Sequence, residues 1–105
     1  MNESSDGMRF EWDEQKSQAN IRNRNLDFAD ARKVFQRPVL RTVDTRKEYG
    51  EERWVGIGML DNLRVVVVVF TELDENTIRI ISMRKALAHE RKQYEQAFRD
   101  EFGTI

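Results

Sequence analysis

The feature of this sequence that most restricts its fold is an uninterrupted apolar run of six residues, from Val65 to Phe70, of which five are valine. β-Branched side chains pack well on a pleated strand, and six residues are far fewer than the ~18 that a membrane-spanning helix needs. A strand with no alternating polar positions is typically buried on both of its faces. We therefore predict that this run is the central strand of a sheet in a globular domain.

The rest of the 105-residue chain supplies the elements that would surround this strand. A helical spacing of apolar residues predicts helices, and alternation predicts further strands. The first predicted helix spans residues 13–24, and a second begins at the N-cap Asp27 and ends before Pro38. Strands are predicted at 39–43, 52–60, 63–71 and 77–83, and a last helix begins at about residue 85. Together they predict one α+β domain over residues 8–105, after a flexible lead-in at residues 1–7.

In this predicted fold, two N-terminal helices and a C-terminal helix pack on a four-stranded antiparallel sheet, and a short extra strand at 9–12 is a further option. The helices are expected to cover one face of the sheet and to leave the other open for a ligand. Alternation groups Arg53 with Val55, Ile57 and Met59, and it groups Arg79 with Ile81 and Met83. Asp61-Asn62 is predicted to form a hairpin turn. The C-terminal helix is predicted to bury Leu87, Tyr94, Phe98 and Phe102.

Charge is segregated along the chain, although the formal net charge is only -1. Residues 16–47 contain nine basic and three acidic side chains, whereas residues 48–76 contain two basic and seven acidic ones. A nearly neutral protein of this kind can still present a positive face to a polyanion. The alternative is that these charges only solvate the surface and compensate one another.

Composition excludes several kinds of chemistry. The chain has no cysteine, which excludes disulfides, thiol nucleophiles and cysteine-ligated zinc, and its one histidine, His89, excludes a mechanism with two imidazoles. No His, Asp and Glu residues have the spacing of metal ligands, so we expect no metal or other cofactor. The sequence shows no leader peptide and no membrane span, and we therefore expect a cytoplasmic protein.

Several short motifs follow one another along the chain. They are Phe10-x-Trp12-Asp13-x-x-Lys16, Leu26-Asp27-Phe28, Asp44 with Tyr49-Gly50-Glu51-Glu52-Arg53, Val68-Val69-Phe70-Thr71, and the run from Ile78 to Ala86. In this order and spacing, residues 8 to about 94 resemble the BrnT family of ribonuclease toxins from bacterial type II toxin-antitoxin systems, which have a RelE-like fold.

This resemblance implies an endoribonuclease that cleaves cellular RNA. It also implies a BrnA-like antitoxin of the ribbon-helix-helix DNA-binding type, which inhibits the toxin in a heterotetramer and represses the shared operon with it. The toxin itself would contact DNA only through the antitoxin, and it would not contact a membrane. The alternative is a degenerate toxin that binds antitoxin or RNA without cleaving it.

Cleavage of RNA by its own 2′-hydroxyl requires a proton acceptor, a proton donor and cations around the phosphate. Arginine suits the cationic role, because its planar fork binds phosphate through two hydrogen bonds and stays charged. If these arginines converge on one sheet face, they explain the segregated charge. The candidate catalytic residues are Glu52, Arg53, Arg64, Arg79 and Arg84. The candidate RNA-binding residues are Lys16, Asn20, Arg24, Lys85 and Tyr94.

Each of these candidates also has a purely structural interpretation. Arg53 and Arg79 could pair with the carboxylates of Glu51, Glu52 or Glu72. Glu52 and a second candidate, Glu90, could accept a proton if their pKa values are raised. Lys85, His89 and Tyr94 are candidate donors, although the helix position of His89 also suits an ordinary exposed histidine. Tyr94 could belong to the core, and the exposed stripe of Lys16, Asn20 and Arg24 could simply be solvated. Trp12 and Trp54 could stack on bases or pack internally.

Overall fold

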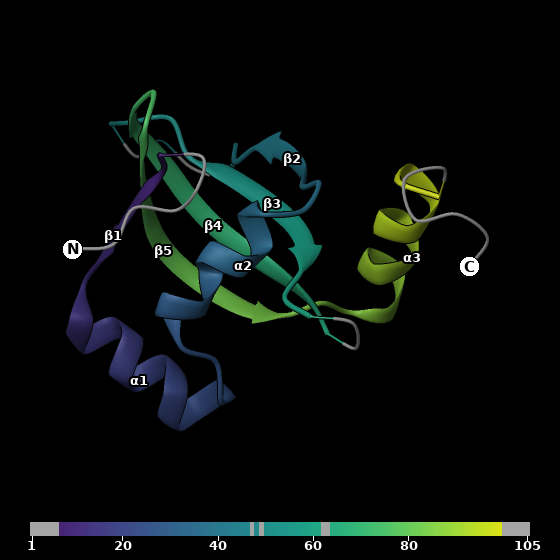
Figure 1. The fold of residues 1–105 in the computed structure, drawn as a ribbon, viewed down its shortest axis with the longest axis horizontal. Coiled ribbons are helices and arrows are strands. Elements are labelled where there is room, and N and C mark those ends of the chain that lie inside the picture. Colours follow the sequence, from purple (N-terminus) through teal and green to yellow (C-terminus); the bar gives the residue numbers. More distant parts are fainter. Residues whose placement is uncertain (1–6, 47, 49, 62–63, 100–105) are drawn as a thin grey trace.

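A computed structural model describes residues 7–46, 48, 50–61 and 64–99 of the chain. Its elements are β1 (Arg9–Trp12), α1 (Glu14–Arg24), the 3-10 helix η1 (Phe28–Asp30), α2 (Ala31–Phe35), β2 (Leu40–Val43), β3 (Trp54–Met59), β4 (Val65–Asp74), β5 (Thr77–Lys85) and α3 (Ala88–Ala97). The strands form a single sheet in the order β1-β5-β4-β3-β2, with α2 in front of it and α3 beside one end (Figure 1). None of the described helices is long and apolar enough to cross a membrane.

The predicted α+β class is confirmed, but the predicted four-stranded antiparallel sheet is wrong. Residues 9–12 form a fifth strand, β1, which lies parallel to β5, with Arg9 opposite Thr77 and Trp12 opposite Ile80. The optional short strand is therefore a real part of the sheet. Its parallel pairing joins the two ends of the domain, and such long-range pairing has no local signal in the sequence.

The N-terminal helices begin where the sequence predicts, but the second is broken in two. Asp27 accepts a hydrogen bond of 2.9 Å from the N–H of Ala29, and this cap starts η1, which leads directly into the short α2. The buried Ser17 of α1 donates to Asp27 at 3.2 Å and accepts from the N–H of Phe28 at 3.1 Å. These bonds fasten α1 to η1 on one face of the sheet.

The central position of β4 is confirmed, and its residues face two separate cores. Val66, Val68 and Phe70 pack under η1 and α2 in the larger core. Val65 and Val67 point to the opposite face, where they pack with residues of β3 and with Tyr94 of α3. Since α3 contacts only one end of this second face, the remainder of the face is not covered by any described helix (Figure 1).

A bulge in β5 overturns one predicted grouping of side chains. Val69 pairs with Ser82, whereas the next residue of β4, Phe70, pairs with Ile80, so Ile81 is an extra residue in β5. A bulge of this kind re-aims the side chains that follow it. As a result, Met83 joins the covered core, and Ser82 shares the uncovered face with Arg79.

The C-terminal helix starts three residues later than predicted, because β5 continues to Lys85. Leu87 is 56% exposed at the start of α3, so its predicted place in the core is wrong. Tyr94 is buried as predicted, and its ring lies 5.1 Å from that of Phe98. The predicted roles of Phe102 and Asn62 fall outside the described residues.

Gly58 of β3 allows α2 to approach the sheet closely. A Cβ atom at this position would lie 2.6 Å from Cγ1 of Val34, a fully buried residue of α2. No flexible side-chain end is available to move away, because Val34 is itself packed in the core.

We therefore expect Gly58→Ala to lower the free energy of unfolding by about 1–3 kcal/mol, through overpacking. Chemical denaturation measures this change. Shortening the neighbour in the double variant Gly58→Ala/Val34→Ala should recover part of the loss, so that the two effects are less than additive. Strict additivity would show that the two residues do not meet.

Candidate functional site

Two of the predicted arginines lie in one row across the uncovered face of the sheet. Arg53 precedes Trp54, which pairs with Phe70, so its side chain points to the same face as Thr71. On the other side of β4, Thr71 pairs with Arg79. Since neighbouring strands are about 4.8 Å apart, the backbones of Arg53 and Arg79 flank Thr71 at a separation of about 10 Å.

A third arginine, Arg84, lies on the same face but farther along the sheet. It pairs with Val67, four residues from Thr71 on β4, which corresponds to about 13 Å along the strand. The predicted convergence on one face therefore describes Arg53, Arg79 and Arg84. It depends on the bulge at Ile81, because without that extra residue Arg84 would point into the covered core.

The arginines of the row have carboxylate neighbours with weak geometry. Nε of Arg53 lies 3.5 Å from Glu51, and a single 3.2 Å contact joins Arg79 to Glu11 of β1. The Arg79 and Glu11 side chains are 44% and 48% exposed. Exposed pairs of this kind contribute about 0–1 kcal/mol, so an incoming phosphate can replace the carboxylate. The expected alternative partner Glu72 instead pairs with Arg41.

Arg84 is held much more tightly. Its two terminal nitrogens donate to the two carboxylate oxygens of Glu90 at 2.8 Å each, and the N–H of Leu87 also donates to Glu90 at 2.8 Å. Hydrogen bonds from Arg84, helped by the one from Leu87, lower the pKa of Glu90 to about 2. The predicted role of Glu90 as a proton acceptor with a raised pKa is therefore wrong. Glu90 positions Arg84 and the start of α3.

The loop after β2 adds two residues that the sequence interpretation missed as site residues. The side chain of Asp44 is 1% exposed and accepts 2.9 and 2.8 Å hydrogen bonds from the guanidinium of Arg46. It also accepts from the backbone N–H of Arg46. An aspartate that bonds to the backbone two residues later is a common turn, so the spacing Asp44-x-Arg46 after a strand was the available signal.

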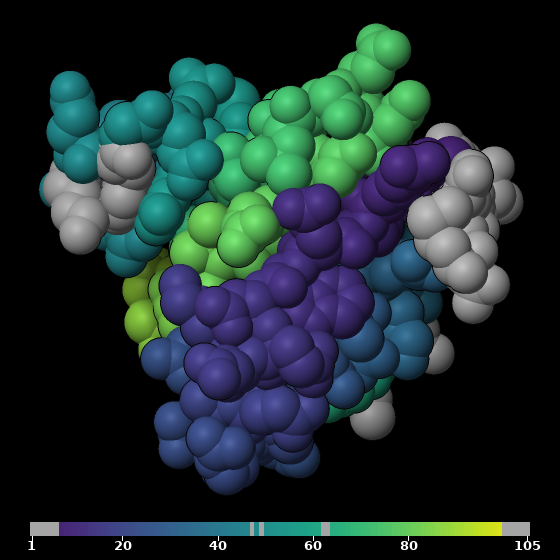
Figure 2. All heavy atoms as spheres, turned by 90° about the vertical axis from the view of Figure 1, so that its left-hand side faces the viewer, coloured from purple at the N-terminus to yellow at the C-terminus, as the bar shows by residue number. Residues whose placement is uncertain are grey.

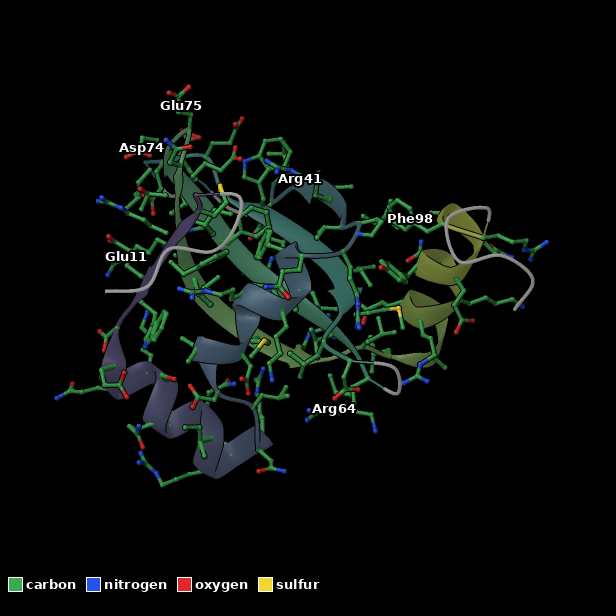
Figure 3. The ribbon with its side chains drawn as sticks, in the orientation of Figure 1. Glu11, Arg41, Arg64, Asp74, Glu75 and Phe98 are labelled. Carbon is green, nitrogen blue, oxygen red and sulfur yellow. The ribbon has the colours of Figure 1, made fainter. Side chains whose placement is uncertain are left out.

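Arg64 is not brought to the other arginines. It precedes the first residue of β4, seven positions from Thr71, or about 23 Å along an extended strand. Its guanidinium donates to Asp61 of the same hairpin at 3.0 and 2.8 Å. Figure 3 shows Arg64 at this end of the sheet, far from Glu11.

The remaining candidates lie in different surroundings. Glu52 is exposed beside Arg53, and its carbonyl accepts a 3.1 Å bond from the hydroxyl of Thr71. Lys85 and His89 are exposed at the end of β5 and on α3. Tyr94 is buried, and its hydroxyl donates to the carbonyl of Pro38 at 2.8 Å, which explains its position by packing rather than by contact with a ligand.

The polar stripe of α1 runs along the edge of the sheet. Asn20 donates to the carbonyl of Leu26 at 2.9 Å and so helps to hold the helix end, while Lys16 is exposed. Arg24 reaches the end of β5 and borders a hollow together with Ser82 and Arg84. Figure 2 shows α1 on one side of β5 and the teal segment that precedes β3 on the other.

Neither tryptophan lies on the uncovered face. Trp12 and Trp54 both pack against the core under the helices. The guanidinium of Arg41 lies 4.2 Å from the centre of the Trp54 ring and covers it. Internal packing therefore accounts for both side chains, and the alternative that they stack on bases is not supported.

Comparisons with known proteins point to one family. A family model described as "Ribonuclease toxin, BrnT, of type II toxin-antitoxin system" matches residues 12–90. Among solved structures, the crystal structure of the Brucella abortus ribonuclease toxin BrnT is similar, with 30% sequence identity and a TM-score of 0.57. The match covers 76% of this chain and 97% of the Brucella chain. No curated protein matches the chain.

The Arg84–Glu90 pair predicts an acid-sensitive contribution to stability. Because the folded protein lowers the pKa of Glu90 to about 2, the contribution is complete above about pH 5 and is lost as the pH falls toward 2. At pH 7, Glu90→Gln should lower the free energy of unfolding by about 1–3 kcal/mol, and this difference should vanish near pH 2. Denaturation curves of both proteins across this range measure it.

The matched control is Glu95→Gln, which removes an exposed carboxylate of the same helix. It should leave the pH dependence unchanged. A similar profile for the two variants would mean that Glu90 has no special partner.

Proposed function

The chain belongs to the family of BrnT ribonuclease toxins of type II toxin-antitoxin systems, and from this membership we propose that it is an endoribonuclease that cleaves cellular RNA on the uncovered face of its sheet. Its site of action would be the cytoplasm. The observation that supports this location best is the row in which Arg53 and Arg79 flank Thr71.

This row has the chemistry that a scissile phosphate requires. Two guanidinium groups on either side of a hydroxyl can hold the phosphate oxygens while negative charge builds up on them. Glu51 lies 3.5 Å from Arg53 and Glu11 lies 3.2 Å from Arg79, and a phosphate can compete with carboxylates at these distances. The phosphate would thus take over the ion pairs of both arginines at once.

The proposed reaction is attack by the 2′-hydroxyl of the RNA on its adjacent phosphate, with no metal cofactor. The nucleophile loses its proton to a base, and the departing 5′-oxygen receives one from an acid. The products are a 2′,3′-cyclic phosphate and a 5′-hydroxyl end. Glu52, which precedes Arg53 in the chain, is the proposed proton acceptor, because it is exposed and its backbone carbonyl accepts a hydrogen bond from the hydroxyl of Thr71.

A second candidate function is RNA or antitoxin binding without cleavage. It is favoured by the fact that Arg53, Arg79 and Arg84 each have a carboxylate neighbour inside the protein. A degenerate toxin could keep such pairs permanently. The two functions differ in whether the RNA remains intact after binding.

The proposed partner is a BrnA-like antitoxin of the ribbon-helix-helix type. A protein that inhibits a cationic RNA site most simply covers it with carboxylates, as Glu11 and Glu51 already do within this chain. Since a ribbon-helix-helix protein is two-fold symmetric, it would hold two toxin chains in a heterotetramer. Repression of the operon would then require DNA contacts of the antitoxin alone.

The activity predicts a clear pattern among arginine variants. Arg53→Ala and Arg79→Ala should each slow cleavage of RNA by a factor of about 100 or more, because each removes a group that stabilises the transition state. Arg64→Ala should cleave like the wild type, since Arg64 is bound to Asp61 far from the row. Cleavage is followed on labelled RNA in the presence of EDTA, with detection of 2′,3′-cyclic phosphate ends.

Equal loss in all three variants would contradict the location of the site. Intact RNA after incubation with folded wild type, together with saturable binding, would select the non-catalytic function instead. Loss of activity in EDTA alone would contradict a reaction without a metal.

Co-expression with the antitoxin tests the proposed assembly. We expect a complex of two toxins and two antitoxins by light scattering, and inhibition that RNA relieves in competition. A complex that cleaves RNA at the free toxin's rate would show that the antitoxin does not cover the row.

A further inference from the structure

A hollow of about 460 Å³ lies on the uncovered face of the sheet, beside the row of Arg53 and Arg79 but outside it. Its floor consists of three valines of the sheet, Val55, Val67 and Val69. Its rim carries three arginines from distant parts of the chain, Arg24 of α1, Arg46 of the loop after β2, and Arg84 of β5. Neither Arg53 nor Arg79 borders it.

The side chains on the rim come from both edges of the sheet. Arg24 and Arg84 approach from the side of β5. Arg46 approaches from the loop that follows β2, where its guanidinium group donates two hydrogen bonds to the buried Asp44. The bonds of Arg84 to Glu90 are equally fixed. Since both forks are held by their own carboxylates, they are pre-organised and lose little freedom when a ligand binds.

Like charges face one another across this hollow. Hydrogen bonds to Glu90 raise the pKa of Arg84, while the nearby charge of Arg46 acts in the opposite direction. Among the described residues, Arg24 has no carboxylate within ion-pair distance to offset its own charge. Asp44, which also lines the hollow, offsets Arg46, and Glu90 offsets Arg84, so an anion here would be attracted mainly by Arg24.

The combination of floor and rim identifies the class of ligand. A flat apolar floor fits the face of a nucleobase or ribose, and hydroxyls such as that of Ser82 can bond to its edges. The guanidinium of Arg24, together with the N–H groups that Arg46 and Arg84 do not use in bonding Asp44 and Glu90, can donate to a phosphate. An acidic peptide would use the rim but leave the floor empty, so the floor favours a nucleotide.

We propose that this hollow is a second subsite, which binds the base and phosphate of a nucleotide adjacent to the cleaved bond. This inference rests on the proposed function, and it places the part of the RNA next to the cleaved bond in the hollow. The position of Arg84 about 13 Å from the row means that one phosphate cannot occupy both places. The substrate is then a single strand that crosses the sheet from the row toward α1.

The first test measures binding of an RNA hexanucleotide whose 2′-hydroxyls are methylated, so that it cannot be cleaved. Arg24→Ala should weaken binding about 10-fold, as expected for the loss of a charge-assisted hydrogen bond, and should lower the slope of log affinity against log salt by about 1. Arg22→Ala is the matched control. It removes the same charge from the same exposed helix end but lies about 200° around the helix from Arg24.

The second test records methyl spectra of the wild-type protein during a titration with adenosine monophosphate. The methyl signals of Val55, Val67 and Val69 should shift, and those of the buried Val66 and Val68 on the other face should not. A glutamate hexapeptide serves as the acidic competitor. If the peptide shifts the valine signals and the nucleotide does not, the hollow is a protein contact and the proposal is overturned.

These measurements separate the two proposals. Equal weakening by Arg24→Ala and Arg22→Ala, or unshifted valine signals, would overturn the subsite even if the protein cleaves RNA. Binding that depends on Arg24, in a protein that leaves unmodified RNA intact, would support the subsite and contradict the ribonuclease activity.

Discussion

Burial of β4 on both of its faces is the constraint on which the rest of the structure depends. A strand of five successive valines must be covered on two sides, and the chain has only a few short helices with which to do so. α1, η1 and α2 complete one face, while α3 reaches only the end of the other, where Tyr94 packs on Val65 and Val67. The uncovered part of that second face carries polar and charged side chains around a floor of valines. The candidate site lies there because no described helix covers this part of the face.

The arginines of this face differ in how tightly their carboxylate partners bind them, and this difference separates them into two groups. Arg84 and Arg46 are fixed by two parallel hydrogen bonds to Glu90 and Asp44, whose side chains are 15% and 1% exposed. Such pairs set the direction of a guanidinium group and persist when a ligand binds. The ion pairs of Arg53 with Glu51 and of Arg79 with Glu11 are longer, at 3.5 and 3.2 Å. Under the proposed function, tightly held arginines beside more weakly held ones suit a surface that binds an RNA strand and then releases the products.

Much of this architecture could be predicted from residue patterns, and the failures have identifiable causes. The central strand, the cap at Asp27 and the shared face of Arg53 with Val55 all follow from local periodicity. The parallel pairing of β1 with β5 and the extra residue at Ile81 do not, because a bulge and a long-range pairing leave no periodic trace. For the same reason, the charge of Arg84 made it a candidate for phosphate binding, but the sequence could not show which face of the sheet its side chain points to. The family resemblance supplied the class of activity, which no local pattern contained.

The pairing of the first described strand with the last also affects when the protein acquires its site. Glu11 and Arg79 are 68 positions apart in the chain, and the row on the sheet is complete only when β5 has joined β4. A nascent chain that has emerged from the ribosome only as far as β4 therefore has Arg53 and Thr71 but lacks Arg79 opposite them. Contacts of such long range also form late in folding. A row assembled in this way is complete only after β5 has been synthesised and has paired with β4.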